Sequence, residues 1–271
     1  MRAAAVLVLY VLIAPLSAGQ TEAVRPAPTA PDGKPDLTGV YQASTRRGAW
    51  DAETPGDQPG VPSPRSPGIV VATGPREPIP FTPEARVRAQ EILNRRSIDD
   101  PAGYCLPLAS PRITNVGLFP VQFAQTPTQV IILYEYLWLF RVVPIDGRPH
   151  PDDMEPSFMG DSVGRWDGNT LVVDVVGFKP GSWLLGGLVA SDALRLTERY
   201  TRVDRDQLSY EVTIDDPKVL TKPFTQRSTL MLREGTRLRE YSCAENNLDP
   251  KVYERMLKDP TLFLRRPETP Q

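Results

Sequence analysis

Two carboxyl groups in this chain fall on strand faces that are otherwise apolar. In the expected strand 194–203, Glu198 shares the inward face with Tyr200, and in the expected strand 170–178, Asp174 lies among valines. A carboxyl group in apolar surroundings has a raised pKa and can serve as a general acid or base. The pattern therefore makes Glu198 and Asp174 candidate catalytic residues.

Several other polar side chains share apolar faces in the same way. Unpaired buried charge is costly, so a dry core should not hold this many charged groups. One hypothesis is a barrel with a partly polar cavity, in which such groups face a ligand. The other is a solvated sheet face, or acid–base pairs that lock the structure. The candidate ligand-binding residues are Arg141, Arg165, Glu135, Asp161, Trp166 and Tyr200.

A motif typical of hydrolases, G-x-S-x-G, occupies residues 160–164 around Ser162. The motif requires a strand, a sharp turn and a following helix to expose the serine, but here a hairpin turn follows. A catalytic triad would also have to use His150, the only histidine of the chain. His150 is thus a third candidate catalytic residue, and the alternative is a solvent-facing histidine in a polar, proline-flanked loop.

The sequence contains few residues that could bind a metal ion or another cofactor. Two cysteines and one histidine cannot supply a closed zinc shell. The acidic residues between 152 and 161 could hold a hard cation such as calcium, but they lack the spacing of a known calcium loop, and a solvated acidic loop is the alternative. No glycine-rich nucleotide loop is present. We therefore expect no cofactor.

The middle of the chain is a succession of short strands separated by turn residues. The clearest is 207–215, where Leu208 and Tyr210 face in while Ser209 and Glu211 face out. The Asp-Gly-Asn at 167–169 is a strong hairpin signal. Successive antiparallel hairpins close most readily into a barrel or a strongly curved sheet. The other expected strands are 37–44, 121–125, 129–135, 136–144, 162–166, 170–178, 194–203, 224–233 and 236–243.

Peripheral segments flank this sheet. Residues 20–36 form a Pro- and Ala-rich leader expected to be disordered, and residues 45–80 form a Pro-rich arm that cannot join a ladder or a helix. A helix is expected from Thr82, its cap, to Arg96. A second short helix is expected at 250–258.

The N-terminal end predicts export. A basic residue, an apolar run and small residues at a cleavage point make residues 1–19 a signal peptide. An uncleaved anchor is the alternative, although the run is shorter than the roughly 20 apolar residues of a spanning helix. No later segment is long and apolar enough to span a membrane, and a net charge of −2 argues against a nucleic-acid partner. A periplasmic or secreted location follows.

The two cysteines, Cys105 and Cys243, fit that location. In an oxidising compartment one disulfide between them is the natural interpretation, and two free buried thiols are the alternative.

Parts of the chain resemble a family of exported bacterial proteins. The likeness rests on Asp-Gly-Lys-Pro-Asp-Leu-Thr-Gly at 32–39 and on residues 158–174, which run Met-Gly-Asp-Ser-Val-Gly-Arg-Trp-Asp-Gly-Asn-Thr-Leu-Val-Val-Asp from 159. The resemblance implies export but no particular activity. In that family histidines often stand where this chain has Ala190 and Arg195, so a site built on them would be altered here. The opening at 37–41 is also weakly similar to the start of lipocalin-type barrels.

These observations predict one mostly β domain over residues 37–271, a lipocalin-like antiparallel meander closing into a barrel or curved sheet, with two short peripheral helices. The first functional hypothesis is an exported protein that binds a small, hydrophobic ligand in a partly polar cavity. The second is an isomerase, cyclase or hydrolase that uses the cavity carboxylates. The third is a structural or assembly protein of the cell envelope.

Overall fold

The computed structural model describes residues 25–43, 79–95, 98–115, 119–185, 187–245, 247–259 and 261. The expected signal peptide at 1–19 and all but the last two residues of the Pro-rich arm at 45–80 lie outside these ranges. Residues 25–36 of the expected leader make defined contacts with the domain, since Arg25 pairs with Asp206 at 2.6 Å. Within the described ranges, no helix has both the length and the apolar character needed to cross a membrane.

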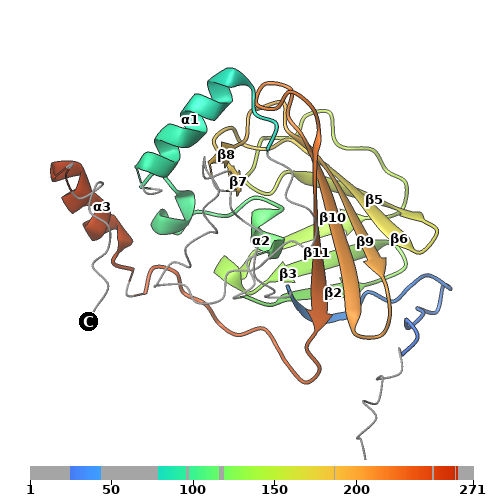
Figure 1. The fold of residues 1–271 in the computed structure, drawn as a ribbon. Helices are drawn as coiled ribbons and strands as arrows, with labels where there is room; N and C mark the ends of the chain where they lie inside the picture. The colour runs from blue at the N-terminus through green and yellow to red at the C-terminus, as the bar shows by residue number, and fades with distance from the viewer. Residues whose placement is uncertain are drawn as a thin grey trace, which may run out of the picture.

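The fold is a nine-stranded antiparallel sheet that curls almost into a closed barrel (Figure 1). The strand order is β4-β3-β2-β1-β11-β10-β9-β6-β5. The predicted mostly β architecture is therefore confirmed. The strands are β1 (Gly39–Ala43), β2 (Val121–Gln125), β3 (Gln129–Tyr134), β4 (Phe140–Pro144), β5 (Asp161–Asp167), β6 (Thr170–Val176), β9 (Arg195–Arg202), β10 (Gln207–Asp215) and β11 (Phe224–Leu232), with a separate hairpin of β7 (Trp183–Leu185) and β8 (Leu188–Val189).

No hydrogen-bonded ladder joins the two edge strands of the sheet. Neighbouring strands in the sheet are antiparallel throughout, so nine strands leave the two edge strands, β4 and β5, running in the same direction. These edges lie side by side without forming a ladder. Gly164 of β5 allows the approach, because a Cβ at this position would lie 2.8 Å from Cγ1 of Val143. Side-chain packing thus closes the seam between β4 and β5.

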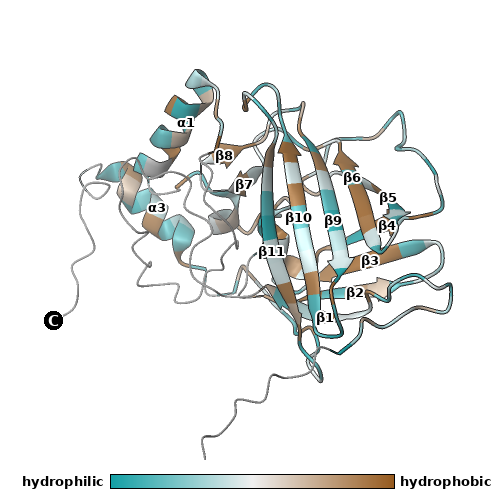
Figure 2. Cartoon of the chain, turned by 45° about the vertical axis from the view of Figure 1, so that its right-hand side comes forward, coloured by the Kyte–Doolittle hydropathy of each residue, from teal (hydrophilic) through white to brown (hydrophobic). Residues whose placement is uncertain are grey.

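Alternating side chains build the core. On β10, Leu208, Tyr210, Val212 and Ile214 are fully buried, and the residues between them are not. Figure 2 shows the resulting alternation of hydrophobic and hydrophilic positions along the strands. The hairpin between β5 and β6 turns at Gly168, whose positive φ of 56° suits glycine. The inward faces and the covering segments form one hydrophobic cluster.

Within the described ranges, three helices accompany the sheet. Helix α1 (Pro83–Asn94) begins after Thr82, whose hydroxyl accepts a hydrogen bond from Ala85 N at 3.2 Å, as predicted. Helix α3 (Asp249–Lys258) forms where the helix at 250–258 was expected and begins at Asp249. The short helix α2 (Arg112–Asn115), which the sequence did not predict, lies against the inner side of the sheet (Figure 1).

Two strand predictions are wrong, one in part and the other entirely. The predicted strand 136–144 is interrupted by the 3-10 turn η2 (Tyr136–Trp138), where Leu137 and Trp138 have φ values of 58° and 54°, so only β4 forms. The predicted strand 236–243 does not form. Its expected place beside β11 is taken by β1, which pairs Tyr41 with Leu232.

The disulfide forms as predicted. Cys105, which follows the 3-10 turn η1 (Pro101–Tyr104), is bonded to Cys243 with a Cα–Cα distance of 5.6 Å. It fastens the irregular segment after β11 to the segment that leads into α2.

Candidate ligand-binding site

The polar side chains of the barrel interior gather around the buried carboxylate of Glu198. It lies on the inward face of β9 and is 0% exposed. Its Oε2 accepts a hydrogen bond from Arg141 Nη2 of β4 at 2.6 Å. Its Oε1 accepts one from the Tyr210 hydroxyl at 2.7 Å and another from the Ser110 hydroxyl. The acid predicted to face inward therefore does so, but as a fully hydrogen-bonded ion-pair partner.

The guanidinium of Arg141 is less completely paired than the carboxylate. The side chain is buried, and Nη2 also lies 3.2 Å from the Tyr200 hydroxyl. Neither Nε nor Nη1 has an acceptor among the described residues. Burial lowers the pKa of Arg141, but the nearby Glu198 carboxylate outweighs burial and holds the pKa well above its ordinary value. Arg141 therefore stays charged and has donors to spare.

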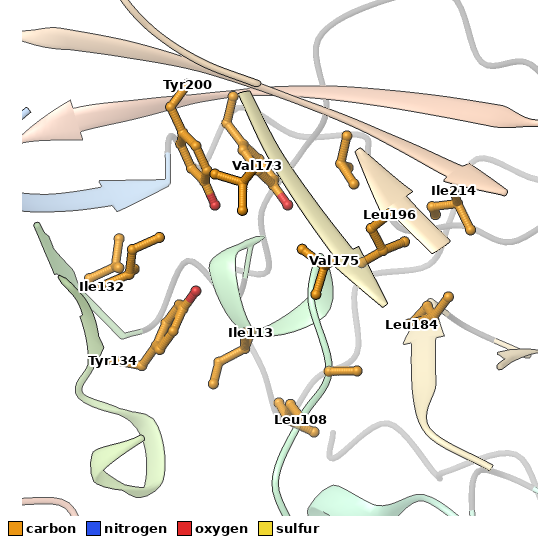
Figure 3. Packing of buried hydrophobic residues seen from close by; sticks show 14 of the residues in the cluster. Leu108, Ile113, Ile132, Tyr134, Val173, Val175, Leu184, Leu196, Tyr200 and Ile214 are labelled. Atoms are coloured by element: carbon orange, nitrogen blue, oxygen red, sulfur yellow. The ribbon is translucent and has the colours of Figure 1, made fainter. Parts of the chain in front are cut away.

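Three tyrosine hydroxyls surround this pair. Figure 3 shows Tyr134 and Tyr200 pointing into the interior, and Tyr210 stacks on Tyr200 with ring centroids 4.9 Å apart. Burial raises the pKa of each tyrosine, and the Glu198 carboxylate adds to the rise. The hydroxyls therefore remain protonated and neutral.

The segment that carries α2 completes the cluster from inside the sheet. Ser110 donates to Glu198, Thr114 lies with its hydroxyl 3.4 Å from that of Tyr134, and Asn115 Oδ1 accepts from Ser228 at 2.7 Å. Sequence reasoning missed these residues, because Ser110 lies in an irregular stretch and α2, with four residues, is too short to show a helical period. The only signal was the pair of prolines around Ser110, which rules out a regular strand there.

A second polar cluster lies on the outer face of the sheet. Asp174 points away from the core cluster that contains Val173, and Arg195 donates two hydrogen bonds to it, both at 2.7 Å. His150 bridges the strands, with Nε2 3.2 Å from Asp174 and Nδ1 2.5 Å from Asp161. Three candidate residues thus meet outside the barrel, apart from Glu198.

The stability that this outer cluster contributes depends on pH through the Asp174 carboxyl group. Burial raises the pKa of Asp174, but Arg195 and His150 together lower it below the ordinary carboxyl value. A folded-state pKa below the unfolded value stabilises the fold above a pH of about 3.9 and ceases to do so as pH falls through the folded pKa. We expect Asp174→Asn to lower the free energy of unfolding by about 1 kcal/mol at neutral pH. This difference from the wild type should become smaller at acidic pH.

Urea unfolding of the wild type and Asp174→Asn from about pH 6 down to about pH 3 measures this deficit. Asp192→Asn, which disrupts an exposed pair with Lys218, is the control and should change stability little. A deficit for Asp174→Asn that stays constant or grows in acid contradicts the expectation.

The remaining sequence candidates lie apart. Arg165 is exposed on the outer face of β5, and Glu135 accepts a hydrogen bond from Arg239 N at 2.7 Å beyond the end of β3. Trp166 packs on the core, and its buried Nε1 has no acceptor among the described residues. Ser162 points inward while its neighbour Asp161 contacts His150 outside, so the strand separates the hydroxyl from the histidine.

Metal ligation finds no support in the part of the chain that the structure describes. No group of three or more His, Cys, Asp or Glu side chains there could hold an ion. The acidic side chains between 152 and 161 do not converge.

Comparisons of the chain with protein-family models, with curated proteins and with solved structures find no match.

Proposed function

We propose that the protein binds a small, largely apolar molecule inside the barrel, against Arg141. The observation that carries the proposal is the guanidinium itself, which is 4% exposed and keeps Nε and Nη1 without an acceptor among the described residues. A buried donor without a partner costs about 1–3 kcal/mol, and more when it is charged. An oxygen atom of a bound molecule would remove that cost.

The surroundings of Arg141 suit such a molecule. Ligand sites are mostly apolar and contain a few convergent polar groups that fix orientation. Here Ile132, Val143 and Leu196 belong to the same buried cluster as the tyrosines, and the hydroxyls of Tyr134 and Tyr200 point into it. This arrangement supports binding of a molecule with an apolar body and a polar end.

The same geometry favours binding over acid–base catalysis. Glu198 already accepts hydrogen bonds from Arg141, Tyr210 and Ser110, so its oxygens have little capacity left for a substrate proton. An assembly role in the cell envelope would give no reason for unpaired guanidinium donors in the interior.

We also propose that the protein works outside the cytoplasm. The signal-peptide pattern at 1–19 and the resemblance to exported bacterial proteins support this location. The Cys105–Cys243 disulfide is compatible with an oxidising compartment.

The test compares the wild type with Arg141→Lys and Arg165→Lys. Lysine keeps a positive charge opposite Glu198 but lacks the forked donors of arginine. Each purified protein is extracted, and the released small molecules are identified and quantified by mass spectrometry. We expect a stoichiometric organic molecule in the wild type and in the exposed-site control Arg165→Lys, and about tenfold less of it in Arg141→Lys.

Thermal melting of each variant shows that it is folded. A wild-type protein that yields no organic molecule overturns the proposal. Equal yields from the wild type and folded Arg141→Lys also overturn it, because the guanidinium would then have no part in binding.

A further inference from the structure

The unpartnered polar atoms of the interior are nearly all hydrogen-bond donors. All but one of the buried side-chain atoms that lack a partner within the described ranges can donate. A molecule that fits this interior must therefore bring acceptors. The atoms are Arg141 Nε, Arg141 Nη1, Ser162 Oγ, Trp166 Nε1, Arg202 Nη1 and the acceptor Gln226 Oε1.

Arg141 and Ser162 belong to one patch at the seam between β4 and β5. A Cβ on Gly164 would lie 2.8 Å from Val143 and 2.9 Å from Ile145, which fixes the register of the two edges. Because the edge strands run in the same direction, Ser162, two residues before Gly164, lies opposite the stretch from Arg141 to Val143. Both side chains are buried and face inward. The register therefore places both side chains on the inner side of the same seam.

The charge of this patch is already balanced. The buried Arg141 guanidinium is matched by the buried Glu198 carboxylate at 2.6 Å. The surrounding tyrosines are neutral, since burial raises their pKa values. A further charge placed here would have no counterion, and uncompensated buried charge is strongly unfavourable.

We infer that the ligand is an uncharged molecule that carries a hydrogen-bond acceptor, and this inference rests on the proposed function. The ligand is a molecule such as an ester, ketone or amide with an apolar body, and not a carboxylate. Its carbonyl oxygen accepts hydrogen bonds from Arg141 and Ser162. A carboxylate would satisfy the same donors but would add a second negative charge beside Glu198. The Arg141–Glu198 ion pair therefore supplies hydrogen-bond donors to the ligand, and its balanced charge disfavours an anionic ligand.

A matched pair of probes tests this selection. Methyl octanoate and octanoate share an apolar chain and differ in charge, and calorimetry at neutral pH gives the Kd of each. We expect the wild type to bind the ester at least about tenfold more tightly. Glu198→Gln removes the balancing charge, so we expect its octanoate affinity to rise at least about tenfold and the order of the probes to reverse. Glu211→Gln, on the outward face of β10, is the control and should keep the wild-type order.

The outcomes separate the two proposals. If wild-type protein binds octanoate as tightly as the ester, the inference about charge is overturned and the binding function stands. An unchanged probe order in folded Glu198→Gln overturns it as well. If that variant does not fold, the Kd of octanoic acid for the wild type is measured at a pH below the pKa of the probe's carboxyl group. The uncharged acid should then bind as tightly as the ester. Weaker binding of the uncharged acid contradicts the inference. Binding of neither probe, together with an empty extract, overturns the proposed function itself.

Discussion

Replacing Glu198 with alanine is expected to lower the free energy of unfolding by about 3–5 kcal/mol, because it leaves the Arg141 guanidinium buried without a counterion. The carboxylate is 0% exposed and also holds the hydroxyls of Ser110 and Tyr210. Those hydroxyls would lose their acceptor in the same substitution. Urea unfolding of the wild type and the variant measures the difference.

A surface pair on the same sheet provides the matched control. Glu211 of β10 pairs with Arg227 at 2.6 Å, and Arg227 is largely exposed. Glu211→Ala should therefore cost no more than about 1 kcal/mol. Equal losses for Glu198→Ala and Glu211→Ala would contradict the buried ion pair.

A double replacement separates the cost of an unpaired charge from the cost of a cavity. Arg141→Met with Glu198→Leu removes both charges and keeps apolar volume, so we expect it to be more stable than Glu198→Ala alone. It should also fail to bind methyl octanoate, because the donors are gone. Stability and binding would then change independently, which is the behaviour expected of residues kept for a ligand.

The alternation of side chains along strands was sufficient to place Glu198, Tyr200 and Arg141 on inward faces, but not to assemble the site. A strand repeats every two residues, so Glu198 on β9 and Arg141 on β4 could each be assigned to the inward face. Their contact could not be predicted, since β4 and β9 are not neighbours in the sheet and meet only across the interior. Ser110 could not be placed on either face, because an irregular segment has no period.

The outer cluster shows the limit of the same reasoning. Asp174 was expected to face a cavity because it lies among valines, and Asp161, one residue before the expected strand 162–166, was a candidate ligand-binding residue. Strand β6 is in fact apolar on both faces, with Val172 buried opposite Val173, so an apolar neighbour did not identify the inner face. His150 joins the two acids from a loop, and no local pattern could have predicted that contact.

The failed strand at 236–243 has a tertiary cause. Glu234 and Gly235, a turn signal, separate the expected strands 224–233 and 236–243, and this spacing favours a hairpin in which the second strand pairs with β11. In the structure that position belongs to β1, which comes from the other end of the chain and pairs Tyr41 with Leu232. Long-range pairing with a better apolar strand prevailed over local turn chemistry, and the displaced segment runs on to the disulfide.

That disulfide carries the second large expected effect. Cys105→Ser with Cys243→Ser should lower the free energy of unfolding by about 2–5 kcal/mol, because the bond closes a loop over a sequence separation of 138 and restricts the unfolded chain. Urea unfolding of the double variant and the oxidised wild type gives the difference. Reduced wild type is the control and should match the variant.

The native contacts around the disulfide determine which parts of the fold are destabilised in the double cysteine variant. Tyr241 packs on Phe119 with centroids 4.7 Å apart, and Tyr253 of α3 packs on Tyr104 at 5.5 Å. These contacts do not need the covalent bond, so the folded state of the variant should keep them. Hydrogen exchange should therefore show α3 protected in the variant, while global stability falls. Loss of protection confined to 233–259 with unchanged global stability would contradict this, because the bond would then act on the native segment instead of on the unfolded chain.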